Sequence, residues 1–360
     1  MILVHREAVS EKAKRNVQQH YVTASILGGF TPDGQRDSQL YVYERNSERS
    51  FTLPPDKAAK RRNYYSIPTK DGSFDDTVDT MLTKLEEQAL PGIRKLLKHD
   101  YALTTFERAL IAYLIAFQEF RTPWARAAFQ QMEITLMEQM MEVGMRAPGY
   151  FEHALEKLKA EGKVADSVTA DQLRDAWDNE KVQLQAKPHM GIDTMVSTSQ
   201  TVGSYYTQMK WTVLFPKAGA FLTSDAPVVR RDPECTGGLF GGGLLSSSAE
   251  VWFPLSKKAC LRIGHDIAKM NKFDELLRVG KRREAEKLRS ELPPIEEREI
   301  DDTIVQAINS QTIVNADRFV FSPFESDEIP LLLKGESKNF RIVTSRPFGR
   351  KNENAKDDGN

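Results

Sequence analysis

The chain has 360 residues, of which 40% are hydrophobic and 28% are charged, a composition typical of a globular protein of one or two domains. The 50 basic and 51 acidic residues give a formal net charge of -1, which excludes a globally basic nucleic-acid binder but not a local basic patch. The 2 cysteines cannot form a disulfide framework or a four-cysteine zinc site, and they fit a reducing compartment.

The sequence has no apolar run long enough to cross a bilayer, so we expect no membrane association. The first residues, MILVHREAVSEK, do not show the order of a signal peptide, because a short apolar stretch precedes the basic residues. We therefore expect a cytoplasmic protein.

The N-terminal region reads as short strands and turns. A short strand or helix start is predicted near 20–27, followed by a glycine-rich turn. The β-rich runs LYVYE (40–44) and SFTLPP (50–55) are separated by five polar residues, which predicts a β-hairpin.

The middle of the chain reads as helical. Apolar residues near a 3.6 period predict a helix over 75–98, which Pro91 should kink or split. Thr104 and Glu107 have the spacing of a capping box, and the segment ALIAYLIAFQEF that follows is apolar almost all round, as in a buried helix. Further helices are predicted over 124–145, 151–161 and 169–185.

The C-terminal part alternates between strands and helices. We predict strands over 210–216, 220–225, 250–256, 259–264, 318–323 and 340–345, and helices over 272–290 and 299–311. The fold class is therefore predicted as α+β, with an N-terminal β-hairpin region, a mostly helical middle and a C-terminal mixed or antiparallel sheet with flanking helices. We expect one domain over 1–345, with 75–190 as a helical subdomain, and a disordered tail over 346–360.

Five methionines fall within the helix predicted over 124–145: Met132, Met137, Met140, Met141 and Met145. A methionine-rich helix can form an adaptable binding groove. Packing in the core is the more common role, and we favour it here.

Three polar residues at the edges of apolar segments are candidate catalytic groups. His20 can transfer protons near neutral pH. Arg121 follows the apolar helix and must find an acceptor, either on a ligand or on an internal partner such as Glu87, Glu107 or Asp225. Asp225 would orient the imidazole or bind a metal; alternatively, Ser224 and Asp225 form a turn.

The sequence identifies no cofactor. The six histidines are far apart, no CxxC is present, and GGLFGGG is neither a P-loop nor a dinucleotide fingerprint. A divalent metal bound by dispersed ligands stays an open alternative.

A local basic and aromatic segment is a candidate nucleic-acid interface. Lys60, Arg61 and Arg62 stand next to Tyr64, a mixture that suits contact with a phosphate backbone and stacking on bases. A solvated surface is the alternative. The second basic run, 278–289, is interpreted as a solvated helix face.

Several segments, in the right order over about 18–325, resemble an uncharacterised bacterial family known only as a domain of unknown function. QHYVTASILGGFT (19–31) is similar to its HYVPQ-like opening motif, and AFLTSDAPVV (220–229) to its TSDNPV-like motif. The other blocks of the family are similar to five further segments of this chain: LYVYERN, FQEFRTP, KWTVL, WFPLSKKACLRIG and INSQTIVNADRFVFS.

The chain departs from the family pattern at Thr23, Ala24 and Ala226, which replace the Pro, Gln and Asn of these motifs. The resemblance places His20, Arg121, Ser224, Asp225 and Asn309 at motif positions and implies no known reaction.

The sequence is compatible with two functions of the protein. The first is a nucleic-acid-directed, nuclease-like hydrolase acting in bacterial stress or phage defence, with His20 as general base, Asp225 as its orienter and Arg121 as an anion clamp. The second is a non-enzymatic binding or regulatory module that uses the basic-aromatic segment or the methionine-rich helix. In the first case the three side chains should converge on an open pocket; in the second they should be buried and mutually satisfied.

Overall fold

The computed structural model describes residues 17–179, 184, 189–234 and 243–335. The predicted strand at 340–345, the tail at 346–360, Cys235 and the GGLFGGG segment lie partly or wholly outside these residues. In order along the chain, the elements of the N-terminal part are β1 (Gln18–His20), α1 (Ala24–Leu27), η1 (Gly28–Phe30), β2 (Leu40–Glu44), β3 (Ser50–Leu53), η2 (Pro55–Lys57), β4 (Lys60–Arg62), β5 (Ile67–Pro68) and β6 (Phe74–Asp75).

Six helices follow: α2 (Thr77–Leu97), α3 (Thr105–Phe120), α4 (Pro123–Arg146), α5 (Tyr150–Ala160), α6 (Ala170–Asp178) and α7 (Ile192–Gln208). The remaining elements are β7 (Lys210–Pro216), β8 (Thr223–Ser224), β9 (Val229–Arg231), β10 (Glu250–Ser256), β11 (Ala259–Gly264), α8 (Ile267–Arg278), α9 (Arg282–Ser290), β12 (Ile295–Ile300), α10 (Asp302–Asn315), β13 (Phe319–Ser322) and α11 (Glu328–Leu332). The α+β class is confirmed.

A five-stranded sheet with the order β12-β7-β11-β10-β9 forms the C-terminal part of the body. β12 is parallel to β7 and the other neighbours are antiparallel, so the predicted mixed sheet is confirmed. A four-stranded sheet, β3-β2-β13-β8, joins the predicted N-terminal hairpin to the C-terminal strand β13. The first and last thirds of the chain therefore share one sheet.

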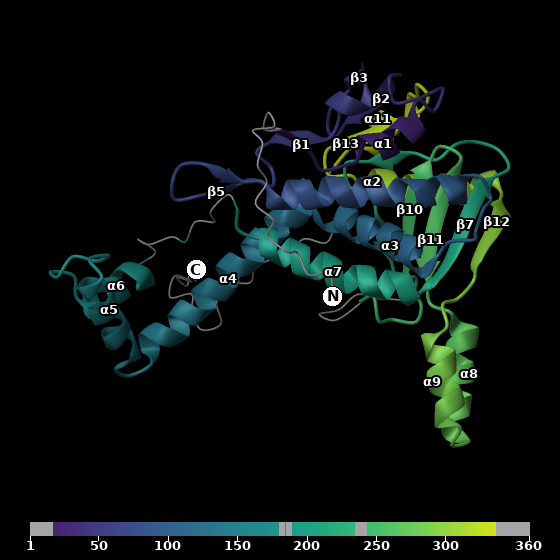
Figure 1. Ribbon diagram of the computed structural model, residues 1–360. Helices are drawn as coiled ribbons and strands as arrows, with labels where there is room; N and C mark the ends of the chain where they lie inside the picture. The colour runs from purple at the N-terminus through teal and green to yellow at the C-terminus, as the bar shows by residue number, and fades with distance from the viewer. Residues whose placement is uncertain (1–16, 180–183, 185–188, 235–242, 336–360) are drawn as a thin grey trace, which may run out of the picture.

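α3 is the buried helix at the centre of the body, and it lies beside α2 and α7 (Figure 1). The capping box of Thr104 and Glu107 starts it as predicted. Apolar side chains of α2, α3 and the five-stranded sheet, among them Ile111, Ile115 and Trp211, belong to one large core cluster. The predicted split of α2 at Pro91 is wrong, because the helix continues to Leu97.

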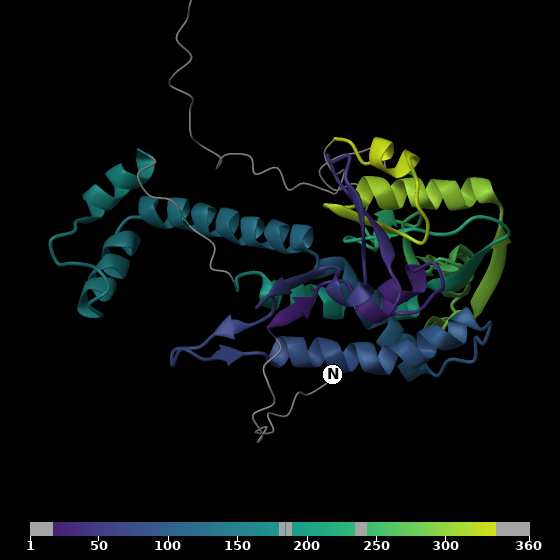
Figure 2. The same cartoon turned by 90° about the horizontal axis from the view of Figure 1, so that it is seen from above.

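Two helical projections leave the body. α4 extends away from it, with α5 and α6 at its far end (Figures 1 and 2); we call residues 123–178 the arm. α8 and α9 form a helical hairpin below the five-stranded sheet in Figure 1. The single helix predicted over 272–290 is wrong, because Gly280, with φ +75°, separates α8 from α9. The helix predicted from 299 is also corrected, since β12 occupies 295–300 and α10 begins at Asp302.

Candidate functional site

Arg121 lies at the end of α3 and is 1% exposed. Its Nε donates to the Tyr21 carbonyl oxygen at 3.0 Å, and its Nη1 donates to Glu86 Oε1 at 2.7 Å. Its Nη2 donates to Thr23 Oγ1 at 2.7 Å and to Gln118 Oε1 at 2.6 Å. The fork of the guanidinium is thus directed at internal acceptors, which is how a buried arginine is usually satisfied.

The internal partner of Arg121 is Glu86, on α2, and not one of the three acids proposed from the sequence. Glu107 instead forms a salt bridge with Lys95, whose Nζ lies 2.7 Å from Glu107 Oε1, and it completes the capping box. Thr23 Oγ1 also lies 3.0 Å from Glu86 Oε1. Arg121 therefore ties the segment after β1 to α2 and α3. Sequence reasoning missed Glu86 because it lies 35 positions from Arg121 on another helix, and no local pattern pairs them.

His20 is the last residue of β1, and its side chain lies partly buried beside η2. Its Nε2 lies 3.2 Å from the Asp56 carbonyl oxygen. Burial lowers the pKa of His20 below its usual range, and the positive charges of Lys60 and Arg121 act in the same direction. The Asp56 carbonyl and the Glu86 carboxylate oppose this fall without cancelling it. The imidazole is therefore neutral at pH 7.

Asp225 follows β8 and is 1% exposed. Its carboxylate accepts three backbone N–H groups: Asp317 at 2.9 Å, Arg318 at 2.8 Å and Phe319 at 2.9 Å. Burial and the nearby Asp317 raise the pKa of Asp225 to about 7, and the three N–H donors oppose the rise. The contacts hold the turn that leads into β13.

Arg121 and Asp225 both interact with Tyr21. The Tyr21 carbonyl oxygen accepts a hydrogen bond from Arg121, and burial together with the negative charge of Asp225 raises the pKa of the Tyr21 phenol. His20 precedes Tyr21 in the chain. Arg121 and Asp225 are directed at protein groups. Over the described ranges, His, Cys, Asp and Glu form no group of three or more that could hold a metal ion.

The basic segment forms β4, which pairs antiparallel with β1 so that His20 is opposite Lys60 and Gln19 is opposite Arg61. Arg61 and Arg62 are exposed, and Lys60 is partly exposed. The Arg61 guanidinium lies 5.9 Å from the ring centroids of both Tyr21 and Tyr64. The three basic side chains are therefore accessible to a partner.

Tyr64 differs from these basic residues because it is only 7% exposed. Its ring packs against Tyr21 at 5.9 Å and Tyr65 at 4.9 Å, and the Arg126 guanidinium lies 4.6 Å from its centroid. Burial raises the pKa of Tyr64 to about 12. In this conformation the ring is not presented as a stacking surface for bases.

The methionine-rich helix α4 carries a set of exposed apolar side chains that the candidate residues do not explain. Leu136 is 56% exposed, Met140 66% and Val143 71%, and Met132 and Met137 are also exposed. The favoured interpretation of core packing is therefore wrong for Met132, Met137 and Met140. Met145 is buried, as that interpretation expected.

The far end of α4 is held on its other face by α6. Trp177 Nε1 donates to Glu142 Oε2 at 2.9 Å, and Arg174 Nε donates to the Met145 carbonyl oxygen at 2.9 Å. The helix is thus apolar on two faces, and the contacts with α6 concern only one of them. An apolar helix face left in water is unfavourable, which singles out the arm as a candidate interaction surface.

No helix among the described residues is long and apolar enough to span a membrane. Neither the curated proteins nor the solved structures contain a significant match to this chain. The model of one family, described as "Protein of unknown function (DUF4238)", matches residues 18–325, which include every candidate residue above. The chain therefore belongs to this family of uncharacterised proteins.

Proposed function

We propose that the protein is a binding module that acts through the arm, without chemistry at His20, Arg121 and Asp225. The observation that carries this proposal is the apolar row on α4, which we define as the exposed Met132, Leu136, Met140 and Val143 together with the partly buried Phe129 at the end nearest the body. Arg121 and Asp225 are both buried, and each is hydrogen-bonded to other groups of the protein, which supports a structural role for these two residues. Exposed, methionine-rich helix faces are typical of surfaces that repack around a partner.

The partner that this row fits best is a second copy of the same chain. The spacing between successive members of the row is three, four, four and three residues, so the row reads the same in both directions about Leu136. With 3.6 residues per turn, this spacing keeps all five residues on one face. A two-fold symmetric interface needs such self-complementarity.

In an antiparallel pair of α4 helices, Met132 would face Met140 of the other copy, and Phe129 would face Val143. Beside the row, Glu133 would come opposite Gln139, so these positions bring no like charges together. The row spans about 21 Å at 1.5 Å per residue, which is short for a stable interface. We therefore expect association in the micromolar range.

Light scattering coupled to size-exclusion chromatography, at several protein concentrations, tests this proposal. The wild type should shift from monomer to dimer with increasing concentration, and Leu136→Glu should remain monomeric with an unchanged circular dichroism spectrum. Ile304→Glu is the matched control, because Ile304 is an exposed apolar residue on α10, outside the arm. A wild type that stays monomeric at every concentration, or a dimer that tolerates Leu136→Glu, would refute it.

The nucleic-acid-directed hydrolase, with a role in stress or phage defence, is the second candidate. It is favoured by the pairing of β1 with β4, which places a neutral imidazole beside Lys60 and near the exposed Arg61 and Arg62. A phosphodiester bound by these cations would lie near a base able to accept a proton. Incubation with DNA and RNA, with and without divalent metal, should then show cleavage that is lost in His20→Ala. Equal cleavage by both proteins would exclude this role of His20.

A further inference from the structure

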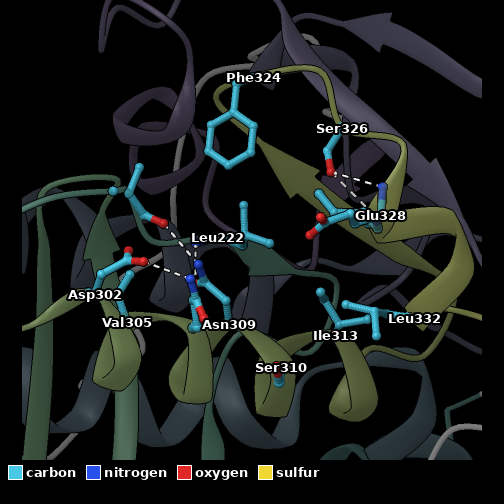
Figure 3. A pocket seen from close by; sticks show the side chains of 14 residues that line it. Leu222, Asp302, Val305, Asn309, Ser310, Ile313, Phe324, Ser326, Glu328 and Leu332 are labelled. Atoms are coloured by element: carbon cyan, nitrogen blue, oxygen red, sulfur yellow. Dashed lines mark hydrogen bonds between the residues drawn. The ribbon is translucent and has the colours of Figure 1, made fainter.

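A cavity of about 690 Å³ lies on the side of the body formed by α10 and α11. Its walls come from α10, from the loop before β8 and from the segment between Phe324 and Leu332 (Figure 3). Its volume is within the range of about 300–1,000 Å³ that is typical of small-molecule sites. It is distinct from the arm and contains none of the candidate catalytic residues.

The floor of the cavity is apolar and firmly held. Leu222, Val305 and Ile313 are almost fully buried side chains that line it. Asn309 fixes the loop to α10, because its Nδ2 donates to the Ala220 carbonyl oxygen and its Oδ1 accepts from the Leu222 N–H, both at 2.9 Å. With both ends of its amide occupied, Asn309 shapes the cavity and has little capacity left to bind a ligand through that group.

Two carboxylates lie on opposite sides of this floor. Figure 3 shows Asp302 of α10 on one side of Leu222 and Glu328 of α11 on the other. Both residues are exposed, and neither forms a salt bridge with any residue in the described part of the chain. Asp302 accepts one hydrogen bond, from Gln306 Nε2 at 2.6 Å. The lining contains no Lys, Arg or His, so its charge is entirely negative.

A glycine keeps the first carboxylate accessible beside the loop. Gly219 has φ +79°, and a Cβ there would lie 2.8 Å from Asp302 Oδ1. Any other residue would be strained and would crowd this oxygen. The loop therefore adopts a conformation that glycine favours and that leaves room next to Asp302.

We propose that this cavity binds an organic cation in which two ammonium groups flank an apolar segment, as in an aliphatic diamine. The apolar segment would lie on Leu222, Val305 and Ile313, and the ammonium groups would pair with Asp302 and Glu328. Anionic ligands such as nucleotides are disfavoured by the same charges. A diamine combines an apolar segment, which suits the floor, with a positive charge at each end, which suits the carboxylates on its two sides.

Isothermal titration calorimetry with octamethylenediamine tests the proposal on the full chain. Octylamine keeps one charge, octanediol keeps the length without charge, and suberate reverses the charge. We expect the diamine to bind more tightly than octylamine, octanediol to bind about tenfold more weakly than the diamine, and suberate not to bind. Binding should weaken as salt is added, because the ion pairs are exposed.

The double variant Asp302→Asn/Glu328→Gln should weaken diamine binding about tenfold, the effect of losing two partly exposed ion pairs. Glu325→Gln is the matched control, because it removes a neighbouring exposed carboxylate that does not line the cavity. No diamine binding at millimolar concentration, equal binding of octanediol, or equal weakening by the control would overturn the proposal. None of these outcomes depends on the arm or on its dimerisation.

Discussion

The replacement of Arg121 by leucine separates a structural role from an anion-binding role. Arg121 makes four side-chain hydrogen bonds, and removing it leaves the Glu86 carboxylate without its charged partner. Breaking a buried ion pair costs about 3–5 kcal/mol. The Glu86 side chain is 22% exposed, so water stabilises part of its charge and the lower end, about 3 kcal/mol, applies.

Other bonds of the network persist in this variant and limit the cost. Gln118 Nε2 still donates to the Tyr21 carbonyl oxygen at 2.6 Å, and Thr23 Oγ1 keeps its contacts with Glu86 and Gln118. Arg121→Lys should be intermediate, because an ammonium keeps the charge but cannot reproduce the planar fork. The expected order of stability is therefore wild type, then lysine, then leucine.

Urea unfolding followed by circular dichroism measures these differences from the midpoint and slope. Arg62→Leu is the matched control, since Arg62 is exposed, and its effect should be within about 0.5 kcal/mol. A double-mutant cycle with Glu86→Gln should give a coupling energy of at least about 1 kcal/mol. If Arg121→Leu costs less than about 1 kcal/mol, or the coupling is absent, the guanidinium is not a structural tie and the anion-clamp hypothesis regains support.

Three further predictions concern the groups around this network and the body. Asp225→Asn should lower the free energy of unfolding by about 2 kcal/mol, because asparagine keeps one acceptor oxygen but its NH2 group cannot accept from the N–H groups bound by the other carboxylate oxygen of Asp225; an unchanged urea midpoint would contradict this. Burial raises the pKa of the Asp79 carboxyl group to about 6, so the folded protein binds the carboxyl proton more tightly than the unfolded chain does. The free energy of unfolding that this proton contributes is therefore fully present below about pH 4 and is lost as the pH rises through about 6. Asp79→Asn should flatten this loss, which solvent screening limits to about 1 kcal/mol, and a pH profile identical to wild type would disprove the assignment. Gly203→Ala should lower the free energy of unfolding by about 1–3 kcal/mol, because its Cβ would lie 2.7 Å from Tyr113 Cδ1 and 3.1 Å from Tyr113 Cα. Gly92→Ala is the milder control in thermal melts, because the closest atom to its Cβ is the Cδ1 at the end of the Ile111 side chain.

Local signals in the sequence predicted many of the elements. The capping box of Thr104 and Glu107 and the hairpin of β2 and β3 depend on residues only a few positions apart, and both are confirmed. β12 was missed because its sequence, IEEREI, is rich in charged residues that strands usually avoid. It is an edge strand whose glutamates face solvent and whose backbone pairs with β7, so the tertiary partner overrides the local preference.

The candidate site was predicted less well because its geometry is set by distant contacts. The sequence indicates that Arg121 needs an acceptor, but only the packing of α2 against α3 selects Glu86. The composition of α4 likewise does not say which of its two apolar faces is covered, since that depends on where α6 folds back. Both cases concern which surfaces meet, which periodicity within one element cannot specify.

Arg121, Asp225 and Asn309 share one physical role, which bears on where function should be sought. Arg121 ties the segment after β1 to two helices, Asp225 ties β8 to the start of β13, and Asn309 ties α10 to the loop before β8. Each is directed at the backbone or at an internal partner, so these three residues join parts of the chain and have little capacity left to bind a ligand. The surfaces left free by these joins are the apolar row of the arm and the acidic cavity. Asn309→Ala should accordingly weaken diamine binding by releasing the loop without removing a ligand contact, so its effect should not depend on salt, whereas that of Asp302→Asn should diminish as salt screens the ion pair.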